Sequence, residues 1–196
     1  KTLLIRFVKK IYCLTNYYNN TLKTKLPEQL YFYPNPFLLS SFVNQKIFTF
    51  KLSKVNINTF WQDFETKKEE ENLNSFFWLN LINRKNDGVA IQQIITIWIK
   101  DNTKFKEKNL NNLQISKRIL AWILNSDIIL NNADKVFKQI FFSSIIMQVN
   151  HLKNNLNDEN DPAKKIEIIS AILLSGLVFK EYNSNFEKGI KALKHV

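Results

Sequence analysis

The sequence predicts a mainly α-helical protein built from antiparallel helical hairpins, with one short extended segment near residues 45–55. Three observations lead to this prediction. Apolar residues recur at helical spacing from about residue 72 to the end of the chain. Short polar turns separate the helical patterns, which favours antiparallel neighbours. Hydrophobic residues make up 45% of the 196 residues, a content that is normal for a folded domain and too high for disorder.

The first third of the chain is expected to contain a helix, an irregular stretch and the extended segment. Residues 2–25 form a basic amphipathic pattern. Its apolar residues at helical spacing are Leu4, Phe7, Val8, Ile11 and Leu14. Three prolines make residues 26–36 irregular or turn-like. The aromatic and β-branched residues of 47–55 indicate the extended piece.

The rest of the chain reads as a series of helices. The run of charges at residues 67–71 is either a solvated linker or a first helical turn. Later helical patterns cover residues 76–82, 89–99, 115–123, 136–151 and 162–179, and the last begins near residue 184. Asp161 is a suitable N-cap, and Pro162 then takes the first helical position. Sequential hairpins of this kind close into an α/α toroid or stack as an open solenoid.

The net charge of +11 is concentrated in the N-terminal third. Residues 1–60 carry +8, whereas residues 61–196 carry +3. This asymmetry favours an anionic partner, and three classes fit: nucleic acid, a membrane surface and an acidic polysaccharide. The alternative is a solvated basic helix in the proteome of an AT-rich genome, which the joint excess of Lys, Asn, Ile and Phe also indicates.

Several classes of site are absent from the sequence pattern. Cys13 is the only cysteine, so we expect neither an intramolecular disulfide nor a cysteine-based zinc site. No Gly-rich phosphate loop, metal-ligand cluster or Ser-His-Asp arrangement is visible, and no cofactor is expected. No apolar run reaches the roughly 18 residues of a membrane span. The chain starts with Lys and stops within a helical pattern, so we expect it to be part of a longer protein.

Four short motifs follow one another in the helical part. They are Ile97-Trp98-Ile99-Lys100-Asp101-Asn102, Ser116-Lys117-Arg118-Ile119-Leu120-Ala121-Trp122, Gln148-Val149-Asn150-His151-Leu152 and Ser175-Gly176-Leu177-Val178-Phe179. In their order and spacing, residues 45–196 resemble the N-terminal helical domain of heparinase II/III-like polysaccharide lyases. The resemblance implies an incomplete α/α toroid over residues 45–196, preceded by a basic helix and Pro-containing linker over residues 1–44. The rest of the toroid and a β-sandwich would follow residue 196.

The resemblance also implies an activity, the β-elimination of uronic-acid polysaccharides, in a bacterial protein of the cytoplasm or periplasm. Many active members of that family carry Gly-Asn-His where this chain has Pro162-Ala163-Lys164. We therefore assign no catalytic residue, and this part alone is not expected to be active. The implied partner is acidic polysaccharide rather than nucleic acid. The alternative function is a non-enzymatic basic helical module that binds nucleic acid or, through residues 2–25, an anionic membrane surface.

Four residues are candidates for contact with an anionic sugar: His151, Arg118, Lys164 and Trp61. His151 continues an apolar stripe, so it is either a hydrogen-bonded core residue or a contact at a cleft edge. Arg118 is either half of an ion pair between helices or a bidentate partner of a carboxylate. Lys164 is either a solvated first-turn lysine or a point charge in place of the missing Asn-His pair. Trp61 precedes the helical array and is the candidate for stacking on a sugar ring. The other tryptophans are expected in the core: Trp78, Trp98 and Trp122.

Overall fold

The computed structural model describes residues 2–35, 52, 56–57, 59–62, 67–82, 84, 87–106 and 109–196. Over these residues the secondary structure is helical and contains no strand. The all-α prediction is therefore confirmed. The extended segment expected near residues 45–55 lies almost entirely outside the described residues; of that segment, Leu52 is described and its side chain is buried.

The N-terminal segment forms two helices, α1 (Thr2–Leu14) and α2 (Asn16–Thr21). Between them Thr15 has an extended backbone, and its Oγ1 accepts a hydrogen bond from the amide of Tyr18 at 3.1 Å. A threonine in this role is a helix N-cap, so it starts a new helix instead of continuing the old one. The expectation of one helix over residues 2–25 is therefore wrong.

The remaining helices follow the expected order. They are α3 (Lys67–Ser75), η4 (Phe77–Leu81), α4 (Gly88–Asp101), α5 (Asn112–Leu124), α6 (Ser126–Ile129), α7 (Lys135–Asn155), η6 (Leu156–Asp158), α8 (Pro162–Val178), η7 (Lys180–Tyr182) and α9 (Ser184–Leu193). The charged run at residues 67–71 belongs to α3, whose first turn holds two glutamates that favour a helix start. The prediction for α8 is confirmed, because Asp161 caps it by accepting from the amide of Ala163 at 3.0 Å. The last helix ends at Leu193 and does not continue to Val196.

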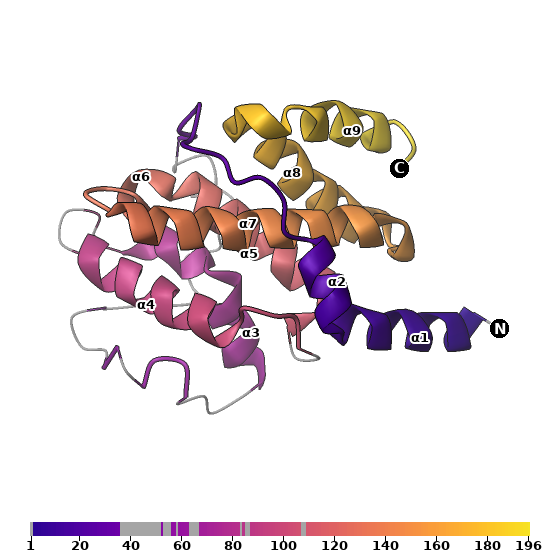
Figure 1. Ribbon diagram of the computed structural model, residues 1–196, viewed down its shortest axis with the longest axis horizontal. Helices are drawn as coiled ribbons and strands as arrows, with labels where there is room; N and C mark the ends of the chain where they lie inside the picture. The colour runs from indigo at the N-terminus through magenta and orange to yellow at the C-terminus, as the bar shows by residue number, and fades with distance from the viewer. Residues whose placement is uncertain are drawn as a thin grey trace.

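Helix α5 is the centre of the molecule. It packs against α3, η4, α6, α7 and α8, and Figure 1 shows α7 running in front of it. Its buried residues lie on several faces and include Ser116 and Arg118 as well as apolar side chains. A helix buried on several faces is typical of a core element. The contacts of Arg118 with Gln148 and of Asn112 with His151 make α5 and α7 antiparallel.

Helices α8 and α9 form an antiparallel hairpin with a very close contact. A Cβ atom placed on Gly176 would lie 2.2 Å from the amide nitrogen of Phe186. A Cβ atom on Gly189 would lie 2.9 Å from Cβ of Leu173. Both distances are too short for a side chain, so the two glycines allow the helix backbones to approach.

An aromatic cluster surrounds Phe76, the residue between α3 and η4. Phe76 is fully buried and has φ 59°, a left-handed backbone conformation that costs a non-glycine residue roughly 1–2 kcal/mol. Its ring centroid lies 5.1–5.9 Å from a ring of every tryptophan in the chain. The tight packing of these rings stabilises the strained backbone. Three of these tryptophans are buried, as predicted: Trp78, Trp98 and Trp122.

The segment of residues 22–35 runs from α2 across α7 to the end of α8, as Figure 1 shows. The side chain of Asn150 donates to the backbone oxygen of Leu22 at 2.9 Å. Farther along, the amide of Tyr31 donates to the carbonyl of Val178 at 2.8 Å. These contacts fix the segment over the helices, where it becomes one wall of a pocket.

Candidate functional site

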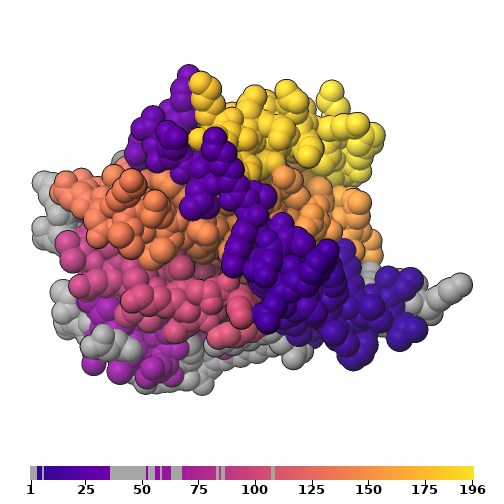
Figure 2. Space-filling view, viewed as in Figure 1, coloured from indigo at the N-terminus to yellow at the C-terminus, as the bar shows by residue number. Residues whose placement is uncertain are grey.

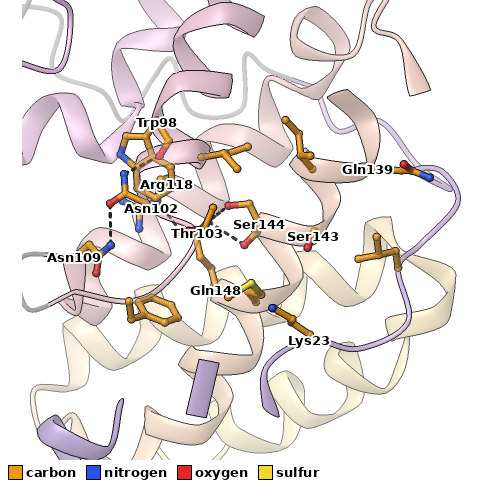
Figure 3. Close-up of a pocket in the computed structure, with 15 residues that line it drawn as sticks. Lys23, Trp98, Asn102, Thr103, Asn109, Arg118, Gln139, Ser143, Ser144 and Gln148 are labelled. Carbon is orange, nitrogen blue, oxygen red and sulfur yellow. Dashed lines mark hydrogen bonds between the residues drawn. The ribbon is translucent and has the colours of Figure 1, made fainter. Parts of the chain in front are cut away.

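A pocket of about 380 Å³ lies between α4 and α7, with the segment after α2 on one side. Most of its surface is apolar. The apolar wall is formed by Leu26, Trp98, Ile99, Phe105, Ile140 and Met147. Figure 3 shows Lys23, Ser143 and Ser144 among the polar side chains that border it. The volume falls within the range of about 300–1,000 Å³ that is usual for small-molecule sites.

Arg118 supplies the buried positive charge of this pocket. Its side chain enters from α5 and is only 2% exposed. Nε donates to Oε1 of Gln148 at 2.6 Å, and Nη1 donates to the backbone oxygen of Asn74 at 3.0 Å. The guanidinium carbon lies 4.2 Å from the centre of the Trp98 ring, which adds a cation–π contact. Figure 3 shows Arg118 beside Trp98 at one end of the site.

The partners of the guanidinium are held in turn by further hydrogen bonds. Nε2 of Gln148 donates to the backbone oxygen and to Oγ of Ser144, at 3.1 and 3.2 Å. Nε1 of Trp98 donates to Oδ1 of Asn74 at 2.7 Å. Because each partner is fixed by a neighbour, the guanidinium is oriented before any ligand arrives, which reduces the entropy lost on binding.

The charge of Arg118 is not neutralised by the described part of the chain. None of its contacts there is with a carboxylate, and Nη2 has no hydrogen-bond partner among those residues. Burial lowers the pKa of Arg118 to about 9, so the side chain is still a cation at neutral pH. A buried charge without a counter-ion is costly. The pocket therefore favours an anion.

His151 lies elsewhere, packed between α2 and α5. Its ring is 2% exposed and stacks on Phe105 with 4.3 Å between centroids. Nδ1 lies 2.8 Å from the Tyr18 hydroxyl and 3.4 Å from Nδ2 of Asn155, and both of these groups act as donors to it. Nε2 therefore carries the proton of the ring and donates to Oδ1 of Asn112 at 3.1 Å. Burial lowers the pKa of His151 to about 4, which keeps the ring neutral at pH 7. The ring also borders a separate hollow of about 270 Å³ next to α1.

Trp61 and Lys164 are also apart from the pocket. Nε1 of Trp61 donates to the backbone oxygen of Ile94 at 3.2 Å, and its half-buried ring packs against Phe76. Trp61 and Asn74 both line a small cavity of about 60 Å³. Lys164 is exposed and forms an ion pair with the capping Asp161 at 3.5 Å. These two residues therefore do not share a site.

Arg118 is thus the one of the four predicted contact residues that lines the pocket. Sequence analysis placed Ser144 and Met147 only on the helix stripe that His151 continues, Trp98 in the core and Gln148 only within a motif. The α7 residues share one helix face at spacings of three and four, but that spacing is the same for a core face and for a pocket wall. Only the tertiary arrangement distinguishes them.

Comparisons with protein-family models, with curated proteins and with solved structures find no match to this chain. Among the described residues, no group of three or more His, Cys, Asp or Glu is placed to hold a metal ion. The same residues include no helix that is both long enough and apolar enough to cross a bilayer. The pocket beside Arg118 is then the strongest indication of function.

Proposed function

We propose that this chain is a helical binding domain for a small amphipathic carboxylate, whose carboxylate lies against Arg118. One observation carries the proposal: a fully buried guanidinium borders a mostly apolar pocket and has no acidic partner among the described residues. A carboxylate would accept hydrogen bonds from Nη2 and from the second proton of Nη1. It would supply the counter-ion in the planar geometry that arginine recognises.

The apolar wall supports the other half of this ligand. Ile99, Ile140 and Met147 present aliphatic and thioether groups to the cavity. A hydrocarbon tail placed there would leave water, with a gain of about 25 cal/mol for each Å² of apolar surface removed. Met147 is flexible and accommodates tails of different shape. A fully polar sugar would gain less from the same wall.

The carboxylate is expected to decide selectivity. An alcohol with the same tail would fill the apolar space but leave the guanidinium without a counter-ion, and an amine would be repelled by it. The difference between acid and alcohol therefore measures the contribution of Arg118. The contribution of the tail is common to both ligands.

The test is calorimetric titration of the protein with decanoate and with decanol. We expect decanoate to bind at least about tenfold more tightly, since a hydrogen bond to a charged group contributes about 1.5–3 kcal/mol. The substitution Arg118→Met keeps an unbranched apolar side chain and should remove this preference. Equal binding of the two ligands by the unsubstituted protein would contradict the proposal.

Two further variants make the result specific. Arg84→Met removes an arginine that contacts Asn125 and Asp127 outside the pocket, so decanoate binding should be unchanged. Ser143→Phe leaves the Arg118 contacts in place and fills the cavity, so binding of both ligands should weaken. Together they separate the loss of the carboxylate contact from a general loss of folding.

The resemblance to heparinase II/III-like lyases supports a second proposal. In that case the helices are part of an incomplete α/α toroid, and Arg118 receives the carboxylate of a uronic-acid unit in an acidic polysaccharide. The same guanidinium supports this proposal, because it matches a uronate carboxylate equally well. Titration with oligouronates tests it, and binding of these without binding of decanoate would favour it. Lyase activity predicts the absorbance of unsaturated uronate when the full-length protein is incubated with acidic glycans, and its absence across a broad panel would contradict that activity.

A further inference from the structure

Helix α1 projects from the body of the molecule (Figures 1 and 2). It exposes large apolar side chains. Leu4 is 67% exposed, Phe7 60%, Val8 58% and Ile11 50%. Single exposed apolar residues are common on protein surfaces, but a contiguous set on one helix marks a surface that has a partner.

Leu4, Phe7, Val8 and Ile11 lie on the face of α1 that points away from the body, and Ile5, which is 63% exposed, lies at the edge of this face. With 3.6 residues per turn, Leu4, Val8 and Ile11 fall within an arc of about 60°. Lys9 and Cys13 fall on the opposite side. Cys13 is buried, and Nζ of Lys9 donates to Oδ2 of Asp158 in η6 at 2.6 Å. The polar side of α1 therefore holds the helix to the body, and the apolar side is turned outwards.

The N-terminal segment that contains α1 is basic and carries exposed aromatic residues. Residues 1–35 contain six Lys and Arg but a single acidic residue, Glu28. Tyr12 on α1 and Tyr17 on α2 are 42% and 70% exposed, and their ring centroids lie 6.4 Å apart. Basic residues are attracted to anionic lipid headgroups, and tyrosine, with an apolar ring and a polar tip, is enriched at membrane–water interfaces.

From this combination we infer that α1 docks flat on a bilayer that contains anionic lipid, with its apolar face among the upper acyl chains. Its 13 residues rise about 20 Å, which is too short to cross a hydrocarbon core of about 30 Å, so the helix lies in the plane of the interface. The charge favours lipid over a second copy of the chain, because pairing two α1 helices brings equal positive charges together.

The inference is tested by sedimentation with vesicles of phosphatidylcholine alone and of phosphatidylcholine mixed with phosphatidylglycerol. We expect at least about tenfold stronger binding to the anionic vesicles, and a decrease as salt is added. The double substitution Phe7→Ser with Ile11→Ser should reduce the binding to anionic vesicles by about tenfold or more, because it removes two large apolar side chains from the interface.

A matched control replaces two apolar residues on other helices that are at least as exposed as Phe7 and Ile11. Val89 is 70% exposed on α4 and Val136 is 68% exposed on α7, so Val89→Ser with Val136→Ser should leave vesicle binding unchanged. Circular dichroism checks that both double variants keep their helices. Equal loss in the two variants, or no binding of the unsubstituted protein to anionic vesicles, would overturn the inference. A dimer in solution that the α1 substitutions dissociate, without vesicle binding, would identify a second copy as the partner instead.

Discussion

His151 makes the stability of the protein sensitive to acid. Its pKa is about 4 in the folded protein, below the ordinary histidine value of 6.5, because burial disfavours the charged ring. Between these values the unfolded chain binds more protons than the folded one, so the free energy of unfolding falls as the pH falls from 6.5 to 4. Above pH 6.5 both states are neutral at this residue and the dependence disappears.

We therefore predict a loss of about 2–3 kcal/mol of unfolding free energy through this residue between pH 6.5 and 4. Chemical denaturation at several pH values measures it. His151→Gln keeps hydrogen-bonding groups but does not titrate, so this variant should be less stable at pH 7 and show a flatter pH dependence. His195 is the only other histidine and is exposed, so His195→Gln should keep the original slope. An unchanged slope in His151→Gln would show that other groups cause the acid sensitivity.

At the same scale, Arg118 shows what the sequence can and cannot reveal. Arg118 lies one helical turn before Trp122, which identified it as a residue of a core helix. Both interpretations of it, an ion pair between helices and a contact with a ligand carboxylate, assumed an acidic partner. In the structure its partners are a backbone oxygen of Asn74 and the amide of Gln148, respectively 44 and 30 residues away. A neutral amide partner leaves no signature in charge patterns. The position of Arg118 on a helix was therefore predictable from the sequence, but the groups that surround it became known only from the fold.

Among the elements, the α8–α9 hairpin depends on two glycines, and the closer of the two contacts is at Gly176. Gly176 faces backbone atoms of α9, which cannot rotate away as a flexible side chain would. We predict that Gly176→Ala destabilises the protein by at least about 2 kcal/mol, because the two helices must move apart. Thermal or denaturant unfolding measures the change.

Gly88, in the first turn of α4, provides the matched control. A Cβ atom placed there would be 3.7 Å from its nearest neighbour, which is an ordinary contact. Gly88→Ala should therefore be neutral or stabilising by up to about 1 kcal/mol, since alanine loses less entropy on entering a helix. A similar destabilisation in both variants would mean that the close contact at Gly176 is not what limits the hairpin.

Helix boundaries were predictable where a local interaction sets them. The start of α8 follows from Asp161 and Pro162, which act on residues next to them in sequence. The break at Thr15 is equally local, but a single threonine does not by itself end a helix, so the pattern of apolar residues suggested continuity. The structure identifies it as a cap because Oγ1 accepts from the amide of Tyr18.

At the scale of the whole molecule, the helices differ in how they are supported. Helix α5 contacts five other elements, whereas the main helical neighbour of α1 is α2. Amides of a central helix exchange with solvent only when the whole protein unfolds, and those of a peripheral helix exchange by local opening. We predict that α1 amides exchange at least about a hundredfold faster than α5 amides. Hydrogen exchange followed by mass spectrometry measures this ratio, with α9 as an intermediate reference; equal protection would contradict it.

The class of the fold was predictable from the sequence, and the spatial order of the helices was not. The helical period and the turns establish an all-α chain, because both are local properties. Which helix lies at the centre depends on contacts between distant segments. For α5, the sequence indicated one apolar face, but buried Ser116 and Arg118 extend the contact surface to polar positions that a hydrophobic pattern counts as exposed.

The ring cluster around Phe76 has a consequence for intrinsic fluorescence. All four tryptophans of the chain lie in this one cluster, so emission reports a single region that joins α3, η4, α4 and α5. Trp98 belongs to the cluster and also stacks on the guanidinium of Arg118 at the pocket. A ligand that neutralises this cation changes the electric field at an indole ring, and emission therefore registers it. Fraying of α1 or separation of α9 leaves the same signal nearly unchanged.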